Sequence, residues 1–390
     1  MHIGVDAAIW QNKRGYGRHA RALLAALVGL DRANRYTLVA DSPQGLDDVP
    51  SQAGLRLVNA DAPAAVAAAA NGHRSLRDMW HMSRALSAPE FDLLLFPTVY
   101  SYVPVISPAR KLVIIHDVIA EKFARLTLPT PTARLFWKAK VALGRRQADA
   151  IITVSDYSRR HIIEHFNLPP ERVHVVGEAS DPVFRRLNRP SLSPRLRSLG
   201  LRTDHRMVAY VGGFGPHKNL TTLVNAFARL AADPALADVR LVMVGENKKE
   251  IYLSDFQTIQ RQVDRLGLAG RVIFTGFLSD EELVILLNCA AVLALPSLME
   301  GFGLPAVEAA ACGCPVVATT ASPLPDLLGD GGLYIDPYRQ DELEDALRRV
   351  LTSPARQQQM SRAALTAAQQ LTWEAAARQL LQVIQTVMEQ

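Results

Sequence analysis

The sequence predicts two α/β domains in tandem, each with a mostly parallel sheet. Short apolar runs of strand length alternate with longer helical patterns throughout the 390 residues, which is typical of strand–helix–strand units. A chain of this length holds about two domains at roughly 100–200 residues each. The alternation breaks at 182–206, which is rich in proline and arginine, and we expect an interdomain linker there.

The individual elements follow from the apolar pattern. Apolar runs bounded by turn residues predict buried strands, and apolar spacings of three and four predict helices such as 18–30 and 219–230. In the first domain (1–182) the expected strands are 2–9, 36–40, 92–96, 112–116, 150–154 and 173–176. In the second (183–372) they are 207–212, 240–244, 271–275, 291–295, 315–318 and 332–335.

The composition excludes several classes of protein. A hydrophobic content of 49% with 21% charged residues is that of a globular chain and not of a disordered one. Only three cysteines are present, so a disulfide scaffold is excluded. No apolar run approaches the roughly 18 residues of a membrane span, and the first residues do not have the pattern of a leader peptide. We therefore expect a cytoplasmic protein.

The net charge of +5 is unevenly distributed along the chain. Residues 1–190 contain 25 Lys and Arg against 17 Asp and Glu, a balance of +8, and the remainder has 18 against 21, a balance of −3. This asymmetry favours an anionic partner for the first half, such as nucleic acid, an anionic membrane surface or a phosphorylated substrate. An ordinary bias of surface charge would give the same balance.

The most informative segment is 295–319, where a predicted strand runs into a glycine-containing loop and then a helix. Gly301 and Gly303 let the backbone approach a ligand closely, and the free N–H groups at the start of the helix form an anion site. Glu300 precedes this site and Glu308 lies about one helical turn inside it. Carboxylates accept hydrogen bonds from hydroxyl groups, so the pattern suits a phosphorylated, polyhydroxylated ligand. Solvated glutamates beside an ordinary strand–loop–helix unit are the alternative.

Two further segments place reactive side chains directly after predicted strands, where ligands bind in open α/β sheets. Lys218 follows a strand that ends in glycines, Gly213 among them. His116 and Asp117 follow the apolar run of the fourth strand. A lone histidine after such a run is more often structural, and a loop lysine is often only solvated. For both residues, a ligand-binding role and a purely structural or solvated role therefore stay open.

Weaker signals lie elsewhere in the first domain. Gly15 and Gly17 precede a helix rich in Ala and Leu and fit either a phosphate-binding loop or a plain turn. Arg18, next to them, is a candidate contact to a phosphate or to a second substrate. Ser155 ends another predicted strand, where it is equally suited to cap the next helix.

Together these segments resemble glycosyltransferase family 4, whose members are retaining enzymes of the GT-B fold, with two Rossmann-like domains facing across a cleft. The resemblance covers nearly the whole chain and rests on MHIGVDAAIW, GYGRHARALLAAL, IIHDVIA, TVSDYSRR, YVGGFGPHKNL, VMVGE, FTGFLSDEEL, the E-x7-E signature EGFGLPAVE, GLYIDP and TWEAAA. It implies that a hexose passes from a nucleotide-diphosphate sugar to an acceptor with its anomeric configuration kept. It also implies that a final helix at about 373–390 packs back on the first domain.

The resemblance further implies a role for each motif. Glu300 would contact the hydroxyl groups of the donor sugar and Glu308 those of the ribose. His116 would contact the sugar near the reaction centre, and Lys218 would stabilise the negative charge that develops on the leaving phosphate. The remaining donor contacts that it implies are Gly15, Gly17, Gly213, Gly301, Phe302, Gly303 and Leu304.

The family often has an arginine beside this lysine, and here the sequence departs from the pattern. His217 stands next to the lysine instead. Either His217 or an arginine elsewhere, Arg18 being the candidate, supplies the second positive charge, or the stabilisation is weaker.

Neither a cofactor nor a metal ion is expected, because the nucleotide sugar is a substrate. Nowhere in the sequence are two aspartates separated by one residue, so the usual diphosphate-metal motif is absent. Cys312 and Cys314 have no companion ligands at zinc-site spacing.

The expected partners are a nucleotide-sugar donor, with GDP-mannose and UDP-hexoses both open, and a glycan or lipid-linked acceptor of cell-surface polysaccharide synthesis. Nucleic acid is not expected.

A predicted helix at 132–147 suggests a membrane contact. Wound as a helix, it places Arg134, Lys138 and Arg145 on one face and Phe136 opposite, and basic amphipathic helices bind anionic lipid. Peripheral association with the inner face of the plasma membrane is therefore an expectation, and an ordinary amphipathic surface helix is its alternative.

Two other functions are compatible with these patterns. A nucleotide-sugar epimerase of the same fold would convert its substrate without an acceptor. A non-catalytic module that binds sugar nucleotides or nucleic acid would use the basic first half, but neither an aromatic stacking motif nor a helix–turn–helix pattern accompanies that charge.

Overall fold

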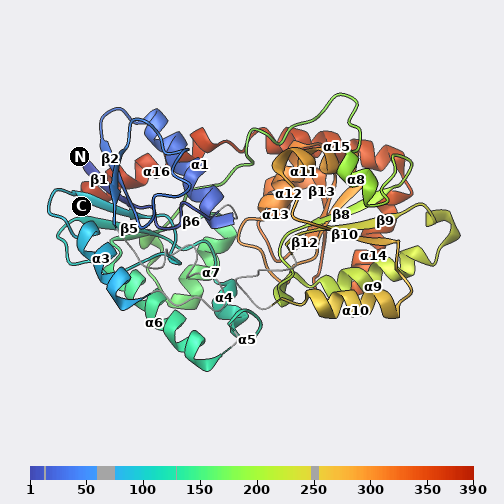
Figure 1. The fold of residues 1–390 in the computed structure, drawn as a ribbon, viewed down its shortest axis with the longest axis horizontal. Coiled ribbons are helices and arrows are strands. Elements are labelled where there is room, and N and C mark those ends of the chain that lie inside the picture. The colour runs from blue at the N-terminus through green and yellow to red at the C-terminus, as the bar shows by residue number, and fades with distance from the viewer. Residues whose placement is uncertain (13–14, 59–74, 129, 247–253) are drawn as a thin grey trace. The chain divides into compact units, whose positions relative to one another are not determined.

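The computed structural model describes residues 1–12, 15–58, 75–128, 130–246 and 254–390, and these form two compact units. The first unit comprises Met1–Ala124, Leu128–Glu178 and Thr372–Gln390, and the second comprises Arg125–Thr127 and Ala179–Leu371. The chain therefore passes from one unit to the other at Glu178, slightly before the expected boundary at 182. Each unit has its own parallel sheet with helices on both faces (Figure 1).

The sheet of the first unit has seven strands within the described residues, and every neighbouring pair is parallel. In spatial order they are β3 (Gly54–Leu57), β2 (Arg35–Ala40), β1 (His2–Asp6), β4 (Leu93–Phe96), β5 (Arg110–Ile114), β6 (Ala150–Thr153) and β7 (Val173–Val175). The edge strand β3 was not predicted, because it contains a glycine and an arginine and most of its residues are exposed, so it has no buried apolar run.

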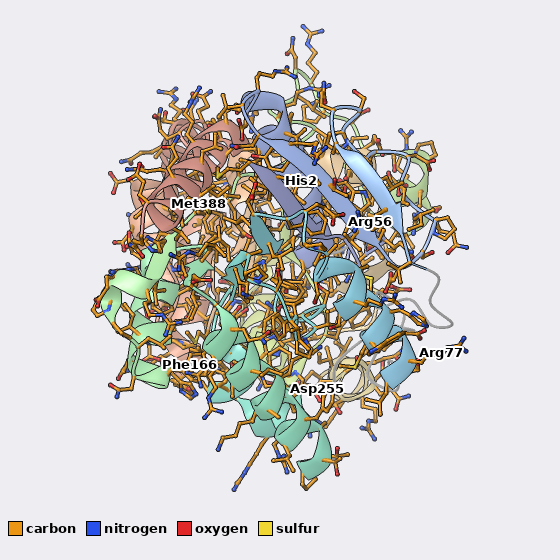
Figure 2. The ribbon with its side chains drawn as sticks, turned by 90° about the vertical axis from the view of Figure 1, so that its left-hand side faces the viewer. His2, Arg56, Arg77, Phe166, Asp255 and Met388 are labelled. Atoms are coloured by element: carbon orange, nitrogen blue, oxygen red, sulfur yellow. The ribbon has the colours of Figure 1, made fainter. Side chains whose placement is uncertain are left out.

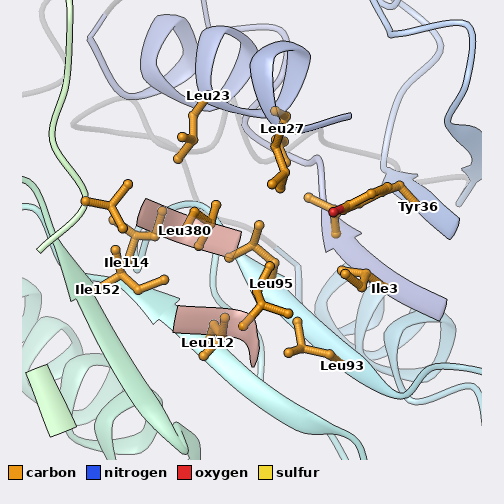
Figure 3. Close-up of a cluster of buried hydrophobic side chains, with 14 of the residues drawn as sticks. Ile3, Leu23, Leu27, Tyr36, Leu93, Leu95, Leu112, Ile114, Ile152 and Leu380 are labelled. Atoms are coloured by element: carbon orange, nitrogen blue, oxygen red, sulfur yellow. The ribbon is translucent and has the colours of Figure 1, made fainter. Parts of the chain in front are cut away.

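Helices cover both faces of this sheet (Figure 1). One face is covered by α1 (Gly15–Leu30) and α16 (Trp373–Met388), so the end of the chain packs with its beginning. Figure 3 shows Leu23 and Leu27 of α1 and Leu380 of α16 meeting the strand side chains in one buried cluster. The other helices of this unit are α3 (Leu76–Leu86), α4 (Ile119–Lys122), α6 (Pro131–Gln147) and α7 (Asp156–Phe166), whereas most of the short helix α5 (Ala124–Thr127) belongs to the second unit.

The second unit repeats this plan with six parallel strands in its described residues. In spatial order they are β10 (Val272–Gly276), β9 (Arg240–Val244), β8 (Met207–Val211), β11 (Val292–Leu295), β12 (Val316–Thr319) and β13 (Gly332–Ile335). One face is covered by α9 (Leu220–Ala231), α10 (Phe256–Arg265) and α14 (Gln340–Leu351) (Figure 1). The other is covered by α11 (Asp280–Cys289), α12 (Leu304–Ala311), α13 (Leu324–Leu328) and α15 (Pro354–Ala368).

The stretch expected to be a linker, 182–206, is largely fixed to the second unit. The side-chain oxygen of Asn288 accepts from the N–H of Leu187 at 2.7 Å, and its amide nitrogen donates to the carbonyl of Arg185 at 2.9 Å. Arg186 donates to the carbonyl of Cys312 at 3.3 Å, and the segment also forms the short helix α8 (Pro194–Ser198). The linker prediction is therefore wrong for most of this stretch, because its backbone and three of its arginines, Arg186, Arg195 and Arg206, bond to that unit.

Among the described helices, none has the length and the apolar character needed to cross a membrane.

Candidate functional site

In the second unit the sequence motifs meet where the strand order reverses. β8 and β11 are neighbours in the sheet, although β9 and β10 lie between them in the chain, so the chain leaves these two strands in opposite directions. Ligands of open α/β sheets bind beyond the carboxyl ends of strands at such a switch point. Lys218 belongs to the segment that follows β8, and Glu300 to the segment that follows β11.

Lys218 and Glu300 form an ion pair across this switch point. Nζ of Lys218 lies 2.7 Å from Oε1 of Glu300, and the hydroxyl of Ser297 donates to the same oxygen at 2.6 Å. Glu300 is only 6% exposed. Burial by itself raises the pKa of Glu300, but Lys218 and the Ser297 hydroxyl outweigh it and hold the pKa below its usual value. The carboxylate is therefore ionised, and the lysine beside it is held in a fixed position.

His217 does not supply a second positive charge in this arrangement. Burial, and then the neighbouring charge of Lys218, lower the pKa of His217 to about 4. At neutral pH its imidazole is uncharged. The structure therefore gives no support to His217 as a replacement for the arginine of related sequences. Arg18, the other candidate, is a partly exposed residue of α1 in the first unit.

Asn219 connects the loops of this site and was missed by the sequence analysis. Its amide nitrogen donates to the carbonyl of Pro296 at 3.1 Å and to that of Pro337 at 2.7 Å, so it joins the segments that follow β8, β11 and β13. Its φ of 57° lies in the left-handed region, which asparagine tolerates better than most residues. An asparagine at the junction of a glycine-rich loop and a helix is the signal that could have identified it.

The loop before α12 has the backbone that an anion site needs. Gly303 caps this helix with a φ of 90°, and a Cβ there would lie 3.0 Å from Cδ1 of Leu324, so both conformation and space favour glycine. The helix then begins at Leu304, with its positive dipole end at Gly303. Of the other predicted contacts, Gly301 and Phe302 lie in the buried loop between Glu300 and Gly303.

Glu308 and Gly213 complete the predicted set in the second unit. Glu308 lies in the second turn of α12 and is 6% exposed, so it is a buried carboxylate and not a solvated one. Gly213 follows β8, and its carbonyl accepts a hydrogen bond from the hydroxyl of Tyr210.

In the first unit His116 is buried at the carboxyl end of β5. Its carbonyl accepts from the Thr153 hydroxyl at 3.0 Å, and neither of its ring nitrogens has a hydrogen-bond partner among the described residues. Burial, and then the adjacent His19, lower the pKa of His116 well below its usual value. The neutral imidazole therefore offers one donor and one acceptor to a ligand.

The neighbouring candidates have local structural roles. Asp117 accepts from the N–H of Ile119 at 2.8 Å at the start of α4. Ser155 caps α7 by accepting from the N–H of Ser158 at 3.0 Å, which is the capping role considered for it. These contacts account for both side chains without a ligand.

The two glycines of the first loop differ in what surrounds them. A Cβ on Gly17 would lie 1.8 Å from the backbone oxygen of Asn12, whereas a Cβ on Gly15 would have no atom within 4 Å. Only Gly17 is therefore required by close packing. Residues 13 and 14 of the same loop lie outside the described part of the chain.

A carboxyl group beside the His116 motif has an unusual pKa. Glu121 of α4 accepts from the indole N–H of Trp137 at 2.8 Å, and burial raises its pKa to about 7. Its second carboxylate oxygen has no partner among the described residues.

This pKa predicts that the contribution of Glu121 to the free energy of unfolding falls as the pH rises. The pKa of Glu121 is raised from 4.5 to about 7 on folding, so its stabilising contribution is complete below about 4.5 and is lost as the pH rises through about 7. Glu121→Gln keeps an acceptor for Trp137 but cannot ionise, so the variant gains stability over the wild type with rising pH, by at most about 3 kcal/mol. Urea denaturation at pH 5 and pH 8 measures this difference. If the stability difference between the variant and the wild type is the same at pH 5 and pH 8, the raised pKa of Glu121 is wrong.

The described residues contain one group with the side-chain types of a metal site. His19, His116 and Glu178 have donor atoms within 4.8 Å of one another. However, Nδ1 of His19 lies 2.6 Å from Oε1 of Glu178, whereas two ligand atoms of a tetrahedral zinc ion lie roughly 3.3 Å apart. In this arrangement these two atoms contact each other and leave no room for a shared ion.

Comparison with known proteins identifies the family. The model described as Glycosyltransferase Family 4 matches residues 13–182, and the model described as Glycosyl transferases group 1 matches residues 195–366.

Among the similar curated proteins is the serotype-specific mannosyltransferase WbdA of Escherichia coli, 25% identical over 398 residues that include 96% of this chain and 46% of that protein. Another is the D-inositol 3-phosphate glycosyltransferase of Nocardioides sp., 32% identical over 65% of this chain and 57% of that protein. The chain thus spans about half the length of each.

The fold is also that of known structures. The sucrose-phosphate synthase of Thermosynechococcus elongatus matches with a TM-score of 0.76 at 19% identity, over 100% of this chain and 99% of that one. At this level of identity the likeness concerns the fold alone, and it is the GT-B fold with two Rossmann-like domains.

Proposed function

Since the chain belongs to glycosyltransferase family 4, in the group 1 glycosyltransferases, we propose that it transfers a hexose from a nucleotide-diphosphate sugar to a glycan or lipid-linked acceptor, with the anomeric configuration retained. The observation that carries this proposal is the pairing of Lys218 with the buried Glu300 at the switch point of the second sheet. A fixed cation, a buried carboxylate and a glycine-capped helix there suit a diphosphate joined to a sugar.

Each group of the second unit has a role in the proposed reaction. The diphosphate binds at the start of α12, and Lys218, which has three donors, keeps its contact with Glu300 and also donates to the phosphate oxygen that leaves. Negative charge grows on that oxygen as the bond to the sugar breaks, so the lysine stabilises the transition state more than the ground state. Glu300 accepts hydrogen bonds from the sugar hydroxyls, and Glu308 accepts them from the ribose.

The bond changes are those of a direct exchange on one face of the sugar. The bond between the anomeric carbon and the phosphate oxygen breaks, a bond to the acceptor oxygen forms, and the acceptor proton passes to the departing phosphate. No side chain forms a covalent intermediate in this scheme. His116, which is neutral, contacts the donor sugar through its ring nitrogens, which have no hydrogen-bond partner in the described part of the chain, and it does not abstract the proton. Metal ions are not required for these steps.

A thermal-shift screen tests the proposal and identifies the donor. Ligands that bind only the folded state raise the melting temperature, so UDP, GDP and ADP are compared first and the corresponding nucleotide sugars next. Similarity to mannosyltransferases makes GDP-mannose the first sugar to test. The absence of any shift with these nucleotides contradicts the proposal.

Product analysis without an acceptor distinguishes transfer from epimerisation, because only an epimerase then converts the donor.

Glu308→Ala is expected to weaken nucleotide binding more than turnover. Loss of a carboxylate that bonds the ribose raises the Kd of the nucleoside diphosphate by about tenfold or more. Titration calorimetry measures the Kd, and Glu281→Ala, which removes an exposed carboxylate of α11, is the control. An unchanged Kd in the Glu308 variant removes this residue from the proposed site.

The acceptor side of the proposal includes an anionic membrane surface, and α6 is the element that would meet it. Leu135, Phe136 and Leu143 on this helix are 70%, 58% and 39% exposed. Lys138 and Arg146 are exposed beside them and complement anionic headgroups.

The basic side expected on α6 is partly turned toward the protein. Arg145 lies over the ring of Phe166 at 4.1 Å, and Arg134 is partly buried, so two of the three predicted basic residues turn toward the protein. Phe166 is the last residue of α7 (Figure 2). Elsewhere in the same unit, Arg77 of α3 points outward and is an exposed cation. Apolar and basic side chains therefore share the outer surface of α6.

Vesicle flotation of the full chain tests this contact. Binding is expected to vesicles that contain phosphatidylglycerol and not to pure phosphatidylcholine, and the double substitution of Leu135 and Phe136 by serine is expected to reduce it at least about fivefold. Phe277→Ser, which removes a 62% exposed aromatic ring from the second unit, is the matched control. Equal binding by both variants, or none by the wild type, excludes α6 as the membrane contact.

A further inference from the structure

The ring of His116 is held between two side chains of the same helix. Tyr16 and His19 lie three positions apart on α1, and so on one side of it. The centroid of the Tyr16 ring lies 4.8 Å from that of His116 at an interplanar angle of 66°, and the centroid of His19 lies 4.7 Å away at 73°. Both are edge-to-face contacts, and they fix the plane of the His116 imidazole.

His19 is in turn fixed by groups from two other parts of the first unit. Nδ1 of His19 lies 2.6 Å from Oε1 of Glu178, which follows β7. The contact is close but poorly aligned for a hydrogen bond. On another side the ring of Trp373, the first residue of α16, lies 5.7 Å from the His19 ring. His19 is 1% exposed and Glu178 5%, so neither is available to solvent.

A buried carboxylate is costly unless it has a partner, and it constrains the partner that it has. The carboxylate of Glu178 favours a hydrogen on the His19 nitrogen that faces it, and the 2.6 Å contact limits how the His19 ring can turn. Because the His19 ring packs edge-to-face against the His116 ring, the orientation of His19 restricts that of His116. Glu178 and His19 can therefore affect His116 without touching the substrate.

We propose that Glu178 and His19 are positioning residues for His116, holding its imidazole in the one orientation in which its ring nitrogens meet the donor sugar. This inference rests on the proposed function, because it assumes that His116 contacts the donor. The pair acts on the geometry of the reaction and not on the binding of the nucleotide, which lies in the second unit.

The test uses the full chain with three substitutions. Glu178→Gln keeps the shape of the side chain and removes its charge, His19→Phe keeps a ring and removes the facing nitrogen, and the third variant combines the two. Each single variant is expected to lower kcat by about ten- to a hundredfold, the loss typical of a small displacement of a reacting group, while KM for the donor changes less than about threefold. The combined variant is expected to lose no more than the worse single one, because both changes act on the same contact.

A spectroscopic readout separates positioning from general destabilisation. The ring-nitrogen signals of His116, assigned by their loss in His116→Ala, are expected to indicate a single tautomer in the wild type and to shift or broaden in Glu178→Gln. Glu171→Gln, an exposed carboxylate beside β7, is the control and is expected to leave both kcat and the spectrum unchanged.

The outcomes distinguish the inference from the function on which it rests. If His116→Ala retains wild-type turnover, the proposed role of His116 fails. If His116→Ala is inactive while Glu178→Gln and His19→Phe keep wild-type kcat and an unchanged His116 spectrum, the positioning role alone is overturned. Independent, multiplying losses in the combined variant also overturn it.

Discussion

Replacing Lys218 by alanine will lower kcat by at least about a hundredfold, the usual loss when a preorganised charge stabiliser is removed. The ammonium lies at the switch point of the second sheet, 2.7 Å from a buried carboxylate, so it is already fixed before the substrate arrives. His217 is uncharged at neutral pH, with a pKa of about 4, and cannot take over the positive charge. Steady-state kinetics with the donor identified by thermal shift measures the loss, which is expected in kcat more than in KM.

This variant needs a control for folding, because Glu300 would lose its partner. A buried carboxylate without a counter-charge destabilises the native state, so the melting temperature of Lys218→Ala is measured beside its turnover. Arg261→Ala, which removes an exposed cation of α10, controls for net charge. Wild-type turnover in a folded Lys218 variant would refute the proposed mechanism.

Gly17→Ala is expected to destabilise the first unit and to reduce turnover, whereas Gly15→Ala is not expected to destabilise it. The new Cβ at position 17 would lie 1.8 Å from the backbone oxygen of Asn12, a distance that only a shift of the helix or of the loop can relieve. Overpacking against rigid backbone costs about 2–3 kcal/mol. Because Tyr16 and His19 on α1 hold His116, a shift of this helix also disturbs the His116 ring.

The matched variant makes this prediction specific to position 17. A Cβ at Gly15 has open space around it, and alanine favours the helix, so Gly15→Ala is expected to be neutral or slightly stabilising. Urea denaturation and kcat of both variants measure the difference. Equal stability of the two variants would show that the loop yields without cost and that packing does not select glycine at position 17.

Much of this fold is determined locally. The predicted strands of both sheets lie close to where the apolar runs placed them, because strands of a parallel sheet covered on both faces must be apolar throughout. The first strand is shorter than its prediction of 2–9 and ends at Asp6. β3 was not predicted for the related reason that it lies at the sheet edge and is mostly exposed, so its sequence contains no apolar run. The site residues Glu300 and Lys218 were also predictable, because glycines, a helix start and strand ends can be recognised in the local sequence.

What the sequence by itself determined was therefore the tandem α/β plan, the family resemblance and the identity of the main candidate residues. Only the tertiary structure decided which of them are neighbours and which faces are covered. Helical periodicity shows that Arg134, Lys138 and Arg145 share one side of α6, but only packing against Phe166 shows that this side is partly turned inward. In the same way Glu178 and His19 stand far apart in the chain and carry no common pattern. Their contact arises because the segment that follows β7 reaches α1 at His19, and such proximity is a property of the folded chain that no local sequence encodes.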